Sequence, residues 1–171
     1  MTGMQTDHDS PWKEILDGYF ADFTALLFPE IHAQIDWSKT YRSLDKELQK
    51  ILPDAESGRR HADKLIEVCR LEDSRSSRSR SAEQRLWILV HIEIQGEPES
   101  AFAARMFQYH VRIRERYNKS VVSLAVLTDT RPNFRPDHFD DGLWVCHIDF
   151  RFPMVKLLDW QAPARWSELE R

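Results

Sequence analysis

The run Trp87–Gln95, Trp-Ile-Leu-Val-His-Ile-Glu-Ile-Gln, constrains the fold more than any other stretch of the chain. It is rich in the β-branched and aromatic residues that fit a pleated surface, so it predicts a strand. A strand sends alternate side chains to opposite faces. One face therefore carries Leu89, His91, Glu93 and Gln95, and the other carries Ile88, Val90, Ile92 and Ile94. Because a buried carboxylate is costly unless it is paired, hydrogen-bonded or bound to a metal, Glu93 needs a specific partner.

The upstream segment Ala62–Leu71 offers an adjacent strand, and Asp63 stands near its start. We expect the two segments to form a hairpin that brings Asp63 beside Glu93 and Gln95. Between them, residues 72–82 are dominated by Ser and Arg, a composition that predicts a flexible hairpin loop rather than part of a core. The arginines of this loop leave open a second interpretation, in which the loop grasps nucleic acid.

The rest of the chain predicts elements that enclose this hairpin. Residues 1–9 are polar and are expected to be flexible. Apolar residues from Trp12 to Leu27 recur at spacings of three and four, which predicts an amphipathic helix that ends at Pro29. A strand, a helix and another strand in succession favour parallel pairing. Further along we expect helices over 44–51 and 101–118, strands over 121–128 and 143–148, a loop over 130–142 and an edge strand over 153–160.

Length and composition predict one domain over residues 1–171, because 42% of the residues are hydrophobic and can form a sizeable core. No run reaches the roughly 18 apolar residues of a membrane span, so we expect no membrane partner. Cys69 and Cys146 stand alone, without a CxxC pattern, and are expected to be buried reduced thiols in a cytoplasmic protein. The chain also lacks a Gly-rich phosphate loop, which disfavours nucleotide-dependent enzymes.

Two carboxylates on adjacent strands, Asp63 and Glu93, form the minimum set of hard oxygen ligands for a divalent ion such as Mg²⁺. A metal ion in such a site polarises a phosphodiester and lowers the pKa of a bound water. The next predicted helix carries a basic stripe whose members are Arg105, Arg112, Arg116 and Lys119. Tyr109 stands one helical turn from Arg105, so the two could face the site as a pair. This stripe could hold the flanking phosphates of DNA.

The residues around this centre resemble the PD-(D/E)XK nuclease superfamily, whose core places an Asp on one strand and an (D/E)-x-K pattern on the next. Over residues 8–150 the chain is similar to the recombination-promoting nuclease/putative transposase group of that superfamily. The similarity rests on Asp63 with Ile92-Glu93-Ile94-Gln95, on Asp9-x-x-Trp12-Lys13 and Phe28-Pro29, and on Leu44-Asp45-x-Glu47-Leu48 and Arg105-Met106-Phe107-x-Tyr109.

The resemblance implies a restriction-endonuclease-like α/β core, with a central mixed sheet of four or five strands flanked by helices. It implies a metal-dependent endonuclease that hydrolyses DNA phosphodiester bonds, with a link to recombination or mobile DNA. Asp63, Glu93 and the backbone carbonyl of Ile94 would hold Mg²⁺, or Mn²⁺ or Ca²⁺ in its place. A homodimer suits an active site that must grip two strands.

Gln95 stands where the superfamily usually has lysine. A neutral amide can orient the attacking water, but it cannot offset developing negative charge as a lysine does. Lys13, on the first predicted helix, could supply a positive charge near the site. The alternative for Gln95 is a hydrogen bond at the end of the strand. For Asp63 and Glu93 the alternative is ion pairing, with Arg60, Lys64 or Arg105 as partner.

His91 shares a face with Glu93, so it could be interpreted as a zinc ligand. The chain supplies no further nitrogen or sulfur ligands at matching spacing, which favours a packed histidine. Packing is equally an alternative for Tyr109. The alternative for the whole chain is a catalytically weakened DNA- or protein-binding module on the same fold.

Overall fold

β3 (Trp87–Gln95) is the central strand of the protein, and the computed structural model describes residues 10–52, 61–71 and 86–161 around it. It pairs antiparallel with β2 (His61–Cys69) and parallel with β4 (Val121–Leu127). β1 (Arg42–Ser43) and β7 (Met154–Lys156) complete a five-stranded mixed sheet in the order β1-β2-β3-β4-β7. The predicted α/β class, the hairpin, the parallel pairing and an edge strand within 153–160 are therefore confirmed.

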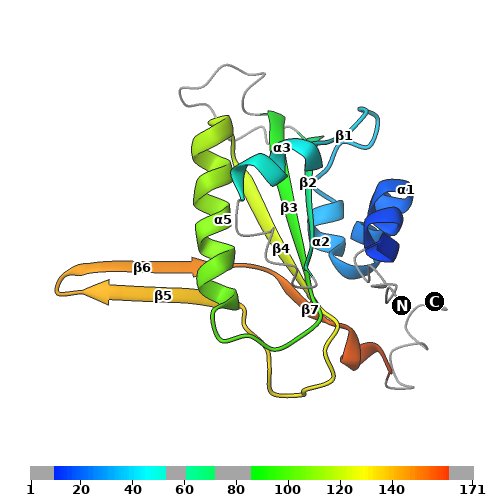
Figure 1. Cartoon of the computed structure of the whole chain (residues 1–171). Coiled ribbons are helices and arrows are strands. Elements are labelled where there is room, and N and C mark those ends of the chain that lie inside the picture. The colour runs from blue at the N-terminus through cyan, green and yellow to red at the C-terminus, as the bar shows by residue number, and fades with distance from the viewer. Residues whose placement is uncertain (1–9, 53–60, 72–85, 162–171) are drawn as a thin grey trace, which may run out of the picture.

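Helices cover both faces of this sheet (Figure 1). α1 (Ser10–Leu27) lies on one face, where its Phe20 packs with Val90 and Ile92 of β3, and the short α2 (Pro29–His32) follows it. α3 (Asp45–Ile51) and α5 (Phe102–Tyr117) lie on the other face, where Leu89 packs with Ile113. The two faces of β3 are thus divided as the alternation of its residues predicts.

The helix boundaries agree with the local sequence. α1 begins at Ser10 and is interrupted at Tyr19, whose φ of −135° and ψ of 32° are not helical. The interruption directly follows Gly18, a residue that weakens a helix interior. α5 ends at Asn118, which adopts the left-handed conformation common at helix ends, with φ of 48°.

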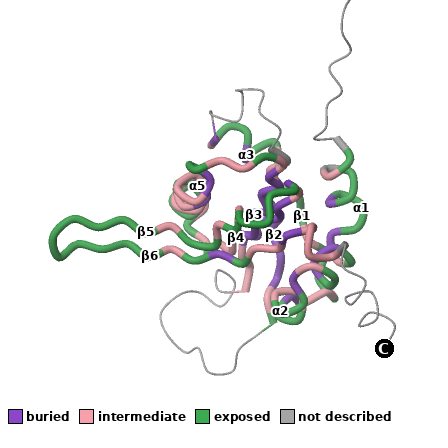
Figure 2. The backbone as a smooth tube through the Cα atoms, turned by 90° about the horizontal axis from the view of Figure 1, so that it is seen from below, coloured by how far each residue is buried: buried purple, intermediate pink, exposed green. Residues whose placement is uncertain are grey.

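A two-stranded hairpin, β5 (His138–Leu143) and β6 (Cys146–Arg151), extends away from the sheet past α5 (Figures 1 and 2). The predicted loop over 130–142 is therefore a loop only as far as residue 137, and the predicted strand over 143–148 is confirmed only at 146–148, within β6. The apolar run that suggested a strand includes the turn itself, which Trp144 closes with a φ of 55°. Because Cys146 lies at this turn it is exposed, so the prediction of two buried thiols holds for Cys69 alone.

The hairpin is anchored at its base and exposed at its tip. Phe107 of α5 stacks on Phe139, with ring centroids 5.1 Å apart, and lies 5.6 Å from Phe150. Trp144 at the tip is 94% exposed.

We expect Trp144→Ser to change the free energy of unfolding by less than about 0.5 kcal/mol, and Phe150→Ala to lower it by at least about 1 kcal/mol. Urea unfolding measures both, and a larger loss for Trp144→Ser would mean that the tip is buried in solution.

Two predictions, the flexible start over 1–9 and the Ser/Arg loop over 72–82, fall outside the described residues. Within those residues, no helix combines the length and the hydropathy needed to cross a bilayer. The assignment of the whole chain to one domain stays a prediction.

Candidate metal centre

The register of the β2–β3 hairpin places Asp63 directly opposite Glu93, and Leu65 opposite His91. Asp63, His91 and Glu93 all lie on the sheet face that α5 covers, and we call them the Asp-His-Glu cluster. One potential ligand atom from each residue lies within 4.8 Å of the other two, so the cluster could hold a metal ion. His91 and Glu93 are fully buried, whereas Asp63 is half-buried, so the cluster reaches solvent on the Asp63 side.

Arg105 of α5 fixes the orientation of Glu93. Oε1 of Glu93 accepts hydrogen bonds from Nε of Arg105 at 2.9 Å and from Nη2 at 2.7 Å. Nη1 of Arg105 donates to Oε2 of Glu99 at 2.6 Å, and the Arg105 side chain is only 14% exposed. Within the described part of the chain, Oε2 of Glu93 has no hydrogen-bond partner, although it is buried. Arg105 therefore occupies one carboxylate oxygen and leaves the other available to a ligand.

The electrostatics of the cluster fit a bound cation. Burial and the negative charge of Asp63, opposed by the positive charge of Arg105, together raise the pKa of Glu93 to about 8. Burial lowers the pKa of His91 to about 3, so its imidazole is neutral, which is the form that binds metals. A divalent cation would stabilise the ionised form of Glu93 that burial disfavours. The residues present therefore fit the group that the sequence implies.

Gln95 has its amide engaged on both sides. Its Oε1 accepts from Nη2 of Arg105 at 2.9 Å, and its Nε2 donates to the backbone carbonyl of Glu97. The amide oxygen of Gln95 thus positions Arg105. The amide nitrogen makes a hydrogen bond at the end of the strand, which is the alternative that the sequence offered to a catalytic role for Gln95.

Ile94, the third ligand that the resemblance implies, offers only its backbone carbonyl. The neighbouring carbonyl of Gln95 accepts from the backbone N–H of Thr128 at 2.9 Å, on the β4 side of β3. Since successive carbonyls of a strand point to opposite sides, that of Ile94 points toward β2, where Ala62 stands opposite it. A metal would have to use the second lone pair of this oxygen.

The four residues expected to contact DNA fall into two pairs. Arg105 and Tyr109 face the sheet, where Tyr109 is buried and its ring meets that of His91 edge-on at 6.0 Å. Arg112 and Arg116 lie further along α5, about two and three turns beyond Arg105. Arg112 is half-buried, and Arg116 is exposed. The packing alternative for Tyr109 and the ion-pair alternative for Glu93 with Arg105 therefore both describe contacts that exist.

Two further cations of the predicted site, Lys64 and Lys119, pair with acids outside the Asp-His-Glu cluster. Lys64 is buried on the face of α1 and pairs with Asp17 of α1 and with Asp45 of α3, so it does not serve Glu93. Lys119 pairs with Glu67 of β2. Lys13 lies in α1, but its side chain, like the whole of Arg60, is outside the described part of the structure.

Sequence reasoning missed Glu99, which binds Arg105 from the loop before α5. A loop position carries no periodic pattern, so only the Glu99–Arg105 spacing of six residues could have suggested the pair. Comparisons with protein-family models, with curated proteins and with solved structures find no match in any of the three sets. The fold and the site therefore define a mixed α/β protein with a cluster that could hold a metal ion.

Proposed function

We propose that this protein is a divalent-metal-dependent nuclease of the PD-(D/E)XK type, which hydrolyses DNA phosphodiester bonds. The observation that carries the proposal is the direct register of Asp63 and Glu93 on one sheet face, with ligand atoms within 4.8 Å. The antiparallel β2–β3 hairpin, followed by α5 and the parallel strand β4, is consistent with a restriction-endonuclease-like core.

In this proposal Asp63 and Glu93 would hold Mg²⁺, Mn²⁺ or Ca²⁺, and a bound ion would supply Lewis-acid chemistry that polarises the phosphodiester and lowers the pKa of a bound water. Arg105 keeps Oε1 of Glu93 in place, and Gln95 in turn keeps Arg105 in place. A buried guanidinium next to the ligating carboxylate supplies the positive charge that Gln95, in the usual position of lysine, lacks.

The part of α5 that points away from the cluster would bind the DNA backbone. Arg116 is exposed and Arg112 is half-buried on the same stripe as Arg105, which suits contacts to phosphates next to the cleaved bond. Two copies of the chain acting as a homodimer would cleave both strands of a duplex.

One observation favours the alternative, a DNA- or protein-binding module that has lost efficient cleavage. Glu93 already has a counter-ion in Arg105, and the Gln95 amide, which would otherwise orient water, is hydrogen-bonded through both its oxygen and its nitrogen. In such a module the same polar network would only stabilise the fold.

Cleavage of supercoiled plasmid by the purified full chain separates the two functions. We expect nicking with Mg²⁺ or Mn²⁺ that EDTA abolishes, and a fall to background in both Asp63→Asn and Glu93→Gln, because each removes a charged ligand of the ion. Asp140→Asn is the matched control, since Asp140 is an exposed acid on the distant hairpin. Absence of metal-dependent nicking in the wild type, or full activity of both site variants, would contradict the nuclease and favour the binding module.

A further inference from the structure

We propose that His91 is a metal ligand, and that the Asp-His-Glu cluster consequently selects divalent transition ions such as Mn²⁺ over Mg²⁺ and Ca²⁺. This inference rests on the metal site of the proposed function but not on its nuclease chemistry. It departs from the interpretation of His91 as a packed histidine.

His91 is a buried polar side chain for which the described part of the chain supplies no hydrogen-bond partner. It is 0% exposed in the middle of the central strand, and neither of its ring nitrogens has a hydrogen-bond partner among the described residues. Buried polar groups in folded proteins are nearly always hydrogen-bonded, and each exception needs an explanation. A bound ion would account for one of the two ring nitrogens, because the ion accepts a lone pair from the imidazole, while the other nitrogen carries the N–H.

The described neighbours of His91 on β2, β4 and α5 do not hydrogen-bond its ring nitrogens. Ser123 stands opposite His91 on β4, but its hydroxyl is held by Nδ1 of His110 at 3.0 Å. Leu65, opposite on β2, is apolar. Tyr109 presents its ring, edge to face, from α5. A carboxylate oxygen of Asp63 and one of Glu93 each lie within 4.8 Å of a ring nitrogen of His91.

Each carboxylate contributes in a way that suits an ion shared with His91. Arg105 holds Oε1 of Glu93, so the buried Oε2 is the atom free to coordinate. Asp63 is the half-buried member, which leaves the remaining coordination positions open to water or to a substrate oxygen. Two carboxylate oxygens and one imidazole nitrogen therefore converge from β2 and β3.

The imidazole determines which ion is preferred. Mg²⁺ and Ca²⁺ take oxygen ligands and gain little from a neutral nitrogen donor. Imidazole instead suits first-row transition ions, whose affinities for mixed nitrogen and oxygen sites exceed those of the alkaline-earth ions. A site designed for Mg²⁺ alone would have no use for a histidine at this position.

The test uses Mn²⁺ and Mg²⁺ binding to the full chain by calorimetry, together with pulsed EPR of bound Mn²⁺. We expect Mn²⁺ to bind at least about tenfold more tightly than Mg²⁺, with a ¹⁴N coupling from one imidazole in the EPR spectrum. His91→Phe should lose the ¹⁴N coupling and about 100-fold of the Mn²⁺ affinity, while its weaker Mg²⁺ affinity changes little. His110→Gln is the matched control, since His110 is engaged with Ser123, and it should retain both properties.

The EPR measurement on the wild type does not depend on whether His91→Phe folds. Bound Mn²⁺ without a ¹⁴N coupling, or unchanged Mn²⁺ affinity in a folded His91→Phe protein, would overturn the role of His91 and leave the carboxylate site of the proposed function standing. Absence of Mn²⁺ binding would overturn both. A ¹⁴N coupling in a protein that does not cleave DNA would support the inference and contradict only the nuclease.

Discussion

Replacing Arg105 by Met is expected to lower the free energy of unfolding by about 3–5 kcal/mol at a pH above about 8, where Glu93 is ionised, which is the usual cost of leaving one member of a buried ion pair without its partner. Glu93 is 0% exposed, and Arg105 is the cation that contacts it. The substitution also removes the donors to Gln95 and Glu99. Urea unfolding, monitored by circular dichroism in the presence of EDTA, measures the loss without a contribution from bound metal.

A second substitution separates the charge from the shape of the side chain. Glu93→Gln in the Arg105→Met protein removes the unpaired charge, so we expect it to recover most of the lost stability. Glu93→Gln alone should cost less than Arg105→Met, because a neutral amide oxygen can still accept from Arg105. A stability of Arg105→Met within about 1 kcal/mol of the wild type would show that Glu93 does not depend on this cation.

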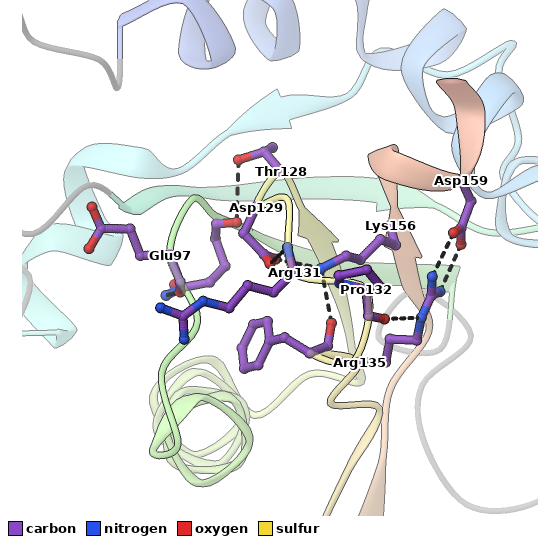
Figure 3. Close-up of polar contacts among 10 residues, drawn as sticks. Glu97, Thr128, Asp129, Arg131, Pro132, Arg135, Lys156 and Asp159 are labelled. Carbon is purple, nitrogen blue, oxygen red and sulfur yellow. Dashed lines mark hydrogen bonds and ion pairs between the residues drawn. The ribbon is translucent and has the colours of Figure 1, made fainter. Parts of the chain in front are cut away.

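Replacing Lys156 by Met is expected to lower the free energy of unfolding by a similar amount, about 3–5 kcal/mol. Nζ of Lys156 contacts Oδ2 of Asp129 at 2.7 Å and donates to the backbone carbonyl of Phe134 at 3.1 Å (Figure 3). The two charged side chains are 0% and 3% exposed. Without Lys156, Asp129 is a buried carboxylate at the end of β4 that lacks its counter-ion, and the 128–134 segment loses its tie to β7.

The same region offers a matched control in the pair between Arg135 and Asp159 (Figure 3). These side chains are 40% and 38% exposed, so water replaces the lost contact and Arg135→Met should cost much less than Lys156→Met. Asp129→Asn in the Lys156→Met protein should restore part of the stability. Equal losses for Lys156→Met and Arg135→Met in urea unfolding would contradict the assigned difference in burial.

The hairpin at the centre of the fold could be predicted from sequence because its two strands carry simple, strong patterns. The alternation of residues in β3 assigns each side chain to one face of the sheet. The two carboxylates then lie side by side only if Asp63 pairs with Glu93, which is the observed register. α1 and α5 were equally accessible, since their apolar residues repeat with the helical period and burial decides which side faces the sheet.

The sequence could not reveal whether a side chain at the edge of the buried face of a helix points toward the sheet or toward solvent. Arg105 lies on the same stripe as the exposed Arg116, and only the packing of α5 over β3 turns Arg105 inward onto Glu93. Periodicity places residues on a face, but it does not say which end of that face is covered. The β5–β6 hairpin escaped prediction for a different reason, because its most apolar run forms an exposed turn rather than a buried strand.

Anomalous diffraction from crystals grown with Mn²⁺ is the most direct test of an ion held by Asp63, His91 and Glu93. We expect a strong anomalous peak within coordination distance of a ring nitrogen of His91, Oε2 of Glu93 and a carboxylate oxygen of Asp63, with Arg105 still bound to Oε1 of Glu93. A cluster with no peak, with Glu93 paired to Arg105 alone, would contradict it.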